Sequence, residues 1–536
     1  MSLRLPELFG GAPRRLAHRL APLWIGDAAR ARAILAGRWK LAGRELAADP
    51  EAGPWRLAAP SKGFGAALHR FGWLDDLAAA DTAAARRAAQ SWTFGWIARF
   101  AEADGPHWAP EIAGPRLRAW LERSELILRE ASADLERRFA GAVHAHERRL
   151  SRAAGRGEGV LEAAAGALLA ELALSAADGP RRRAAKRLAA AADAAVAQDG
   201  GLAARNPEAL GEALVALVSA ERHLHDAGVE AEEGLTDAVH RLAAALRALR
   251  LRDGALPRFH GGGPGAPARL DHALALVRGH GGAERRDAAM GFTRLSAGRT
   301  SLVVDAAAPP ETPEAHAATL AFELAHGTRR LVVNCGPGAA LGGEWAAACR
   351  ATAAQSTLSL DGVSSSRIAP DARGPGPHPF AHRPRRVGAE TAQDLEGSWF
   401  LGAHDGWLDS HGLVHSRRLF LSPDGRDFRG EDLLEPPDPR AGARAARMAE
   451  GLGFSVRFHL PPEVAAVARA DAEGVLLALP EGAWRVTARG GALELAESVY
   501  LDPALPAPVA TKQVVVTGVV SDYSARVTWG FRRLPA

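Results

Sequence analysis

The sequence predicts a two-part α+β protein in which an all-helical half precedes a half built of antiparallel β-strands. Apolar residues recur at helical spacing through residues 27–250, the composition changes to Gly, Pro and His over 256–282, and short β-branched runs follow. With 536 residues the chain is also too long for one ordinary core. We therefore expect a helical domain over 1–255, a Gly-rich junction over 256–285 and a β-sandwich domain over 286–536.

The helical half is rich in Ala, Leu, Arg and Glu and is interrupted by Gly-Pro pairs, which end helices. Segments such as 126–150 and 210–225 place apolar residues three and four apart, so each predicts a helix with one buried face. Five tryptophans recur here, at Trp73, Trp92, Trp96, Trp108 and Trp120. They indicate packing between helices or, alternatively, a groove in which flat indoles stack on sugar rings.

The second half contains short β-branched runs separated by Gly, Asp and Pro, as in 300–305, 331–334, 413–421 and 513–518. Helix-length segments do not alternate regularly with these runs. The pattern therefore favours an antiparallel sandwich over a parallel α/β sheet.

The composition excludes several classes of protein. Hydrophobic residues make up 47% and charged residues 24% of the chain, which is typical of a globular protein rather than a disordered or fibrous one. The formal net charge of +4 is small for this length and predicts no nucleic-acid partner, although arginine forks suit the carboxylates or sulfates of an anionic polymer. Because Cys335 and Cys349 are the only cysteines, we expect two buried free thiols and no metal knuckle.

The beginning of the sequence has arginines scattered through it and no uninterrupted apolar core, so it does not resemble a signal peptide. The most apolar stretch, 160–177, contains Glu162 and Glu171 and falls short of a membrane span. We therefore expect no transmembrane segment. The missing signal peptide predicts a cytoplasmic location, with the periplasm or cell envelope as the alternative.

Four motifs follow one another along the chain. Residues 199–207 read DGGLAARNP, 315–324 read AHAATLAFEL, 333–336 read VNCG and 350–357 read RATAAQST. They resemble the DGGH-x-x-RNP, H-x-D-x-L-x-F-E-L, D-x-G and R-x-T-x-x-H-[NS]-T segments of heparinase II/III-like proteins. The resemblance implies an incomplete α/α toroid, a β-sandwich and a site in the cleft between them. It also implies β-elimination at a uronic acid of an anionic polysaccharide, such as a glycosaminoglycan.

Such an elimination must neutralise the uronate carboxylate, remove the neighbouring proton and protonate the departing oxygen. By position, Arg205 and Asn206 are candidates for neutralising the carboxylate, although Asn206 before Pro207 is equally a helix cap. The tyrosine that the family commonly uses has no counterpart near the junction, where the nearest titratable group is His260. We therefore expect His260 to be the acid/base or, alternatively, a hydrogen-bonded loop histidine.

The remaining site residues follow from the resemblance. It implies a catalytic centre of Asn206, His260 and His316, with substrate-binding roles for Arg205, Arg350, Gln355 and His404. His404 begins an H-D-G-W turn similar to one in the family, and stabilising that turn is its alternative role.

In the family, a zinc ion is held by the His of H-x-D, the Asp of D-x-G and the His before [NS]-T. The corresponding residues here are His316, Asn334 and Gln355. Neutral amides are poor zinc ligands beside imidazole and carboxylate. We therefore expect neither a tightly bound zinc nor another cofactor, with a hydrogen-bonded network of these three side chains in its place.

These motifs predict two functions. The first is a lyase that cleaves a uronic-acid-containing anionic polysaccharide or oligosaccharide by β-elimination. The second is a carbohydrate-binding or envelope-associated protein of the same fold that has lost the chemistry, since the missing tyrosine and metal ligands weaken the first prediction. A purely structural scaffold is a third alternative.

Overall fold

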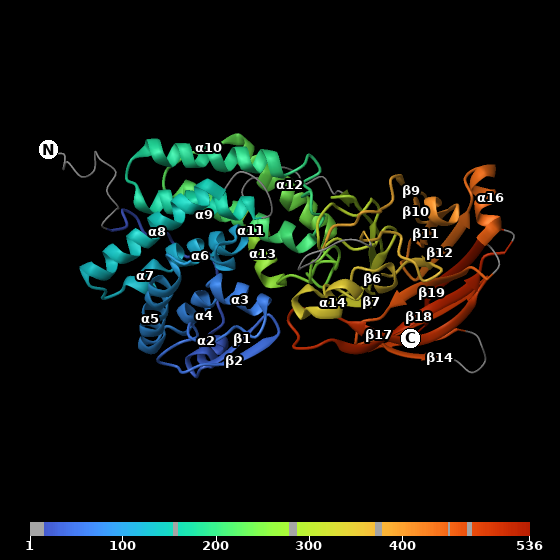
Figure 1. Cartoon of the computed structure of the whole chain (residues 1–536), viewed down its shortest axis with the longest axis horizontal. Helices are drawn as coiled ribbons and strands as arrows, with labels where there is room; N and C mark the ends of the chain where they lie inside the picture. The colour runs from blue at the N-terminus through green and yellow to red at the C-terminus, as the bar shows by residue number, and fades with distance from the viewer. Residues whose placement is uncertain are drawn as a thin grey trace. The chain divides into compact units, whose positions relative to one another are not determined.

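The computed structural model describes residues 15–153, 159–277, 287–369, 378–448, 451–468, 474–521 and 523–535. The chain divides into two compact units (Figure 1). The helical unit comprises Met1–Ala197, Glu212–Ala243 and His272–Gly279, and the β unit comprises Gln198–Gly211, Ala244–Asp271 and His280–Ala536. Two segments of the predicted helical half and junction therefore group with the β-strands. Positions 278–285 of the predicted junction lie outside the described residues.

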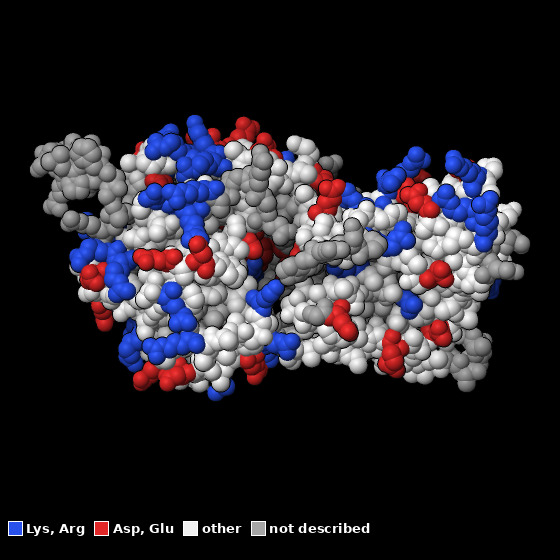
Figure 2. All heavy atoms as spheres, in the orientation of Figure 1, with Lys and Arg blue, Asp and Glu red and all other residues white. Residues whose placement is uncertain are grey.

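The helical unit consists mainly of helices. They are α2 (Ala28–Leu35), α3 (Lys62–His69), α4 (Trp73–Ala80), α5 (Ala83–Phe100), α6 (Pro110–Glu122), α7 (Ser124–Leu128), α8 (Ala133–Ala153), α9 (Val160–Leu174) and α10 (Asp178–Ala195), with a hairpin of β1 (Arg38–Leu41) and β2 (Arg44–Ala47). Residues of α11 (Pro207–Asp226), α12 (Glu233–Leu249) and α13 (Pro267–Leu276) are divided between the two units. On the face shown in Figure 2, Lys and Arg side chains gather over α10. Among the described residues, no helix is both long and apolar enough to cross a membrane.

An aromatic cluster fills the core of the helical unit. All five tryptophans that the sequence singles out are at most 8% exposed. The rings of Trp96 and Trp120 meet edge to face with centroids 5.3 Å apart, and the Arg116 guanidinium lies 4.1 Å from the centre of the Trp96 ring. These indoles therefore pack between helices, which is the first of the two interpretations of their pattern.

The described part of the β unit contains three antiparallel sheets. A five-stranded sheet has the order β3 (Ala288–Ala289), β4 (Phe292–Ala297), β5 (Thr300–Asp305), β6 (Phe322–His326) and β7 (Arg329–Val332). A four-stranded sheet has the order β17 (Ala492–Tyr500), β18 (Val509–Val519), β13 (Gly453–His459) and β8 (Leu358–Leu360). An eight-stranded sheet has the order β14 (Ala465–Ala468), β15 (Val475–Leu479), β16 (Gly482–Arg489), β19 (Ala525–Arg533), β12 (Asp427–Glu435), β11 (Leu413–Leu421), β10 (Ser398–Trp407) and β9 (Val387–Gln393).

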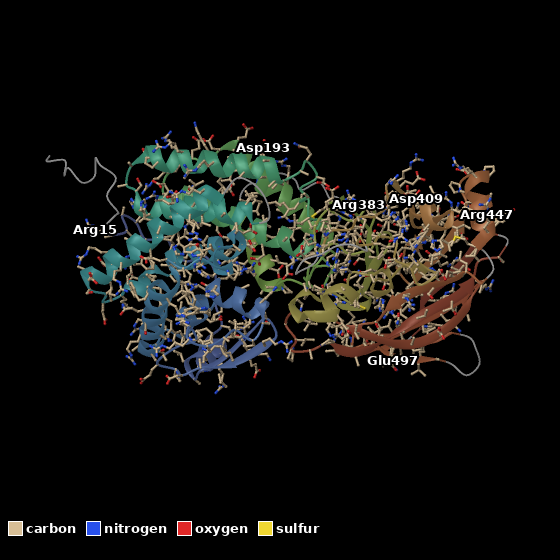
Figure 3. All side chains as sticks on the ribbon, viewed as in Figure 1. Arg15, Asp193, Arg383, Asp409, Arg447 and Glu497 are labelled. Carbon is tan, nitrogen blue, oxygen red and sulfur yellow. The ribbon has the colours of Figure 1, made fainter. Side chains whose placement is uncertain are left out.

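One apolar core joins the three sheets, with buried residues such as Val304, Val456 and Val527. Along β11 buried and more exposed residues alternate, so one face of the eight-stranded sheet packs on the core and the other faces outward. Short helices α14 (Gly343–Ala348), α15 (Leu408–His411) and α16 (Pro439–Met448) lie between strands, and Arg447 and Glu497 mark the periphery of the unit (Figure 3). The predicted fold class, helices followed by antiparallel sheets, is confirmed.

The two cysteines are free and buried, as the sequence predicts. Burial raises the pKa of the Cys335 thiol to about 11 and also raises that of Cys349. Both thiols are therefore protonated at neutral pH and are poor nucleophiles.

Candidate functional site

A buried Arg-Asp-His cluster forms the centre of the candidate site, and all of its members belong to the β unit. Asp305, the last residue of β5, accepts a hydrogen bond from the guanidinium of Arg205. Its other oxygen lies 3.2 Å from Nε2 of His260, and the Asp305 and His260 side chains are fully buried. An isolated buried carboxylate would be strongly disfavoured, so the two basic partners are what permit it there.

The charges of this cluster set its protonation. Burial raises the pKa of Asp305, but the opposing effects of Arg205 and His260 are larger together, so the net shift is downward. Burial lowers the pKa of His260, with Asp305 acting in the opposite direction. At neutral pH the cluster therefore holds an ionised carboxylate, a guanidinium and a neutral imidazole.

Arg205 is fixed by the main chain as well as by Asp305. Its Nε donates to Met290 O at 2.9 Å, Nη1 to Ala308 O at 2.6 Å and Nη2 to Gly291 O at 2.9 Å. With Asp305, four of its five N–H groups have protein partners. Its backbone φ of 50° lies in the left-handed region, which costs a non-glycine residue conformational energy. The guanidinium therefore connects the segment before α11 to the region of β3, β4 and β5. Binding of a substrate carboxylate by Arg205 stays a prediction.

Asn206 caps α11. Its Oδ1 accepts from the backbone N–H of Glu208 at 2.9 Å and of Ala209 at 3.2 Å, which is the N-cap arrangement. A Cβ added at Gly262 would lie 2.4 Å from this same Oδ1, so only a glycine lets the His260 loop approach the cap. Of the two roles that the sequence leaves open for Asn206, the structure shows the cap.

His260 and His316, the two candidate catalytic histidines, each accept a hydrogen bond from the backbone of the other's segment. His260 Nδ1 accepts from the backbone N–H of His316 at 3.2 Å, and His316 Nε2 accepts from the backbone N–H of Gly261 at 3.1 Å. These partners place the ring proton of His260 on Nε2, toward Asp305, and that of His316 on Nδ1. His260 itself has φ 48°, a second left-handed non-glycine residue at the site.

His316 lies near Gln355. Burial lowers the pKa of His316 to about 3, while the Gln355 side chain acts in the opposite direction. His316 Nδ1 and Gln355 Oε1 have no hydrogen-bond partner among the described residues. The Gln355 Nε2 donates to Cys349 O at 2.7 Å. The Asn334 Oδ1 accepts from the backbone N–H of Ser356 at 2.9 Å, so it serves the strand connection rather than the His316–Gln355 pair. Of the three side chains expected to form a network, His316 and Gln355 are therefore neighbours, whereas Asn334 bonds the backbone of Ser356.

The residues at the family's zinc positions do not fit a zinc ion. The Nε2 lone pair of His316 already accepts from the Gly261 N–H, and the Gln355 amide donates to a carbonyl. Within the described ranges, no group of three His, Cys, Asp or Glu side chains is arranged to hold a metal. The expected absence of zinc stays a prediction that metal analysis of the purified protein can test.

His404 belongs to a second buried network, on the inner face of the eight-stranded sheet. Its Nδ1 accepts from the Gly406 N–H at 3.1 Å, its Nε2 lies 3.2 Å from His415 Nδ1, and His415 Nε2 lies 2.7 Å from Asp432 Oδ1. Because each Nδ1 accepts, each Nε2 carries the proton, and the chain of hydrogen bonds runs one way to Asp432. Arg417 donates to both Asp432 oxygens, at 2.7 and 3.0 Å. Burial lowers the pKa of both histidines, so both rings are neutral.

Arg350 is also engaged by the protein. Its Nε donates to Ala315 O at 2.9 Å and its Nη2 to His378 O at 2.7 Å, while its guanidinium lies 4.6 Å from the centre of the Phe380 ring. The residue is 4% exposed. It therefore fastens the segment before His316, and its substrate-binding role stays a prediction.

The sequence analysis misses two buried acids, Asp305 and Asp432, and discounts Tyr500 because of its distance in sequence from the junction. Asp305 ends the otherwise apolar run of β5, and a charge that closes a fully buried strand was the available signal. Asp432 had no such signal, because it sits on an alternating strand like any other. Tyr500, distant in sequence, packs its ring centre 4.0 Å from the guanidinium of Arg258, two residues before His260.

Comparison with known proteins agrees with this architecture. Residues 282–530 match the family described as heparinase II/III-like, C-terminal. The chain is 33% identical over 558 residues to FtsZ-localized protein C of Caulobacter vibrioides, covering 98% of this chain and 93% of that protein. The crystal structure of heparinase III has a TM-score of 0.69 at 12% identity, covering 96% and 86% of the two chains. The heparan sulfate lyase HepC from Pedobacter heparinus has 0.58 at 14%, covering 95% and 83%.

The chain has helices followed by antiparallel sheets, and His260 and His316 are buried side by side in the β unit. This arrangement is the fold of the polysaccharide lyases named above. More particularly, the chain belongs to the heparinase II/III-like family, as its four motifs predict. At 12–14% identity the solved structures speak for the fold alone. The Caulobacter relative carries a name that refers to FtsZ and not to a lyase.

The cap role of Asn206 can be separated from carboxylate binding by two substitutions. Asn206→Ala should lower the free energy of unfolding by about 1 kcal/mol, because two N–H groups of α11 lose their acceptor. Asn206→Asp keeps an acceptor oxygen and should unfold close to wild type, although it would repel a carboxylate ligand. Urea denaturation followed by circular dichroism measures both. If the Asp variant lost as much stability as the Ala variant, the cap would not be the reason for this residue.

Burial of neutral His316 should make stability depend on pH. Its pKa falls from 6.5 to about 3 on folding, so between these values the unfolded chain binds the extra proton. The stability is therefore complete above pH 6.5 and decreases as the pH falls. From pH 6.5 to about 5 the contribution is about 2 kcal/mol. Urea titrations of wild type and His316→Gln at both pH values should differ by this amount, and equal pH dependence in the two proteins would disprove the assignment.

Proposed function

We propose that this chain is a non-catalytic member of the heparinase II/III-like family that localises with FtsZ. The burial of the candidate centre carries the first half of the proposal. His260, His316 and His404 are at most 2% exposed, and one ring nitrogen of His260, one of His316 and both of His404 have hydrogen-bond partners in the protein. A general acid or base must come within hydrogen-bond distance of the proton that it transfers, which these rings can do only if the loops around them open.

The remaining tyrosines support the same proposal. Burial raises the pKa of Tyr500, which disfavours the phenolate that a base in the elimination requires. Tyr523 is 50% exposed. The amides at two of the three zinc positions support the proposal further, because they are poor zinc ligands.

The second half of the proposal is supported by the relative. FtsZ-localized protein C aligns with 98% of this chain, so both units have a counterpart in it. A shared role at FtsZ would need no lyase chemistry, and the family's sugar-binding architecture would serve as an interaction scaffold. Retained binding of a uronic-acid polysaccharide without cleavage is compatible with this role.

The absence of lyase activity is directly measurable. Heparan sulfate incubated with the wild-type protein should give no ultraviolet absorbance from an unsaturated uronate, whereas heparinase III as a positive control should. His260→Ala and Tyr500→Phe should behave like wild type. If wild type formed the unsaturated product and either folded variant lost it, the alternative of an uronate-cleaving lyase with that residue as acid/base would replace the proposal.

Association with FtsZ is measurable by sedimentation. The purified full chain should pellet with FtsZ polymers and stay in the supernatant when FtsZ is omitted. The matched control is heparinase III, which shares the fold and should remain in the supernatant in both cases. Equal amounts of this chain in the pellet with and without FtsZ would contradict the proposed role.

A further inference from the structure

The outward face of the eight-stranded sheet carries a groove of about 770 Å³. Its lining comes from five neighbouring strands of the β unit, β10, β11, β12, β19 and β16, and from Glu396 just before β10. Along β11 the more exposed Arg418 and Phe420 alternate with the buried Arg417, Leu419 and Leu421, of which Leu419 also lines the groove. The groove is therefore built mainly by outward-facing side chains, and it adjoins the buried histidine network through Trp529, whose indole N–H donates to Asp432.

The pairing of the strands arranges this lining in rows. One row, from β10 to β16, is Trp399, Phe420, Arg429, Gly530 and Thr487. The next row contains Arg418, Glu431, Thr528 and Arg489. With neighbouring strands about 4.8 Å apart, the first row extends over roughly 19 Å. This length suits an extended segment rather than a small molecule.

The lining is positively charged overall. Five arginines (Arg418, Arg429, Arg485, Arg489 and Arg532) stand against three carboxylates (Glu396, Asp427 and Glu431). Asp427 is bonded by Arg429 and Arg532, so this carboxylate is already neutralised within the groove. The exposed Arg489 makes no hydrogen bond or ion pair with any described residue. An incoming carboxylate would therefore meet at least one guanidinium, that of Arg489, that has no acidic partner among the described residues.

The floor of the groove is low at its centre. Gly530 stands between Arg429 and Thr487 in the first row, and a Cβ added there would meet only ordinary contacts, at 3.6 Å or more. At the β10 end, the Trp399 ring lies 4.5 Å from that of Phe420 and is tilted by 49°, and Trp399 is 37% exposed. This end therefore offers an apolar aromatic patch.

We propose that this groove docks an acidic protein segment, with carboxylates on its arginines and one apolar side chain on the Trp399–Phe420 patch. The inference rests on the proposed function, in which the partner is a protein assembly. Strands β12 and β19 are hydrogen-bonded on both sides, so the segment cannot add as a strand there and is recognised by side chains. The charge of the groove would also speed the encounter and make it sensitive to salt.

Binding of a defined peptide tests the groove. The probe is a fluorescently labelled synthetic peptide rich in Asp and Glu with one Leu, and its Asn/Gln counterpart is the uncharged comparison. Arg489→Glu reverses the unpaired charge, and Gly530→Gln fills the floor without changing charge. Arg447→Glu, on exposed α16 outside the groove, makes the same charge change elsewhere in the unit. Fluorescence anisotropy gives the dissociation constants, and circular dichroism confirms that each variant is folded.

The acidic peptide should bind wild type and Arg447→Glu alike and bind both groove variants at least about tenfold more weakly. The uncharged peptide should not bind. Wild-type affinity in Gly530→Gln and Arg489→Glu would overturn the proposal, as would an equal loss in Arg447→Glu, which would indicate attraction by net charge alone. If heparin oligosaccharide binding were lost in the groove variants while peptide binding persisted, the site would be a glycan site instead.

The outcome is separable from that of the FtsZ experiment. If the peptide bound at the groove but the chain did not sediment with FtsZ, the proposed docking site would stand and FtsZ would be rejected as the partner. Sedimentation with FtsZ that is unchanged in Arg489→Glu and Gly530→Gln would keep the function and reject this surface.

Discussion

The contact on which the rest of the candidate site depends is the buried carboxylate of Asp305 with Arg205 on one oxygen and His260 beside the other. It joins the segment before α11, the end of β5 and the glycine-rich loop, three parts of the chain that are far apart in sequence. Removing Arg205 would leave the Asp305 carboxylate buried without a compensating charge, which is among the more costly changes a protein can suffer. The left-handed backbone at both Arg205 and His260 is tolerated because this contact holds both residues in place.

This arrangement changes what the motif residues mean. In an active lyase the conserved types would face a substrate, yet here Arg205, Asn206 and Arg350 bond main-chain groups, and His260 and His316 accept from each other's loops. These side chains serve as structural links between segments of the β unit. A motif residue can therefore contribute to the fold whether or not it also contacts a substrate.

The periodicities of the sequence were sufficient for the fold, because helical spacing before residue 250 and β-branched runs after residue 287 each report a local preference. The motifs were sufficient to find His316 and Gln355, and the Gly-rich junction was sufficient to find His260, which lies beside His316. Asp305 and Asp432 were missed, since a buried acid is identified by partners that only the folded chain supplies. The same is true of Tyr500, which lies against Arg258 despite a separation that local patterns cannot bridge. Grouping of residues 198–211 and 244–271 with the β unit likewise depends on long-range contacts.

On β11 and β12, adjacent residues carry like charges toward opposite sides of one sheet. Arg417 and Asp432 pair beneath it, whereas Arg418 and Glu431 lie above it and face each other in register. Because side chains alternate with a period of two, inserting or deleting one residue in β11 would turn its inward-facing side chains outward. Leu419 and Leu421 would then leave the core and Phe420 would leave the groove, although an arginine would still face each side of the sheet. The apolar core and the apolar end of the groove are thus both set by a single alignment of these strands.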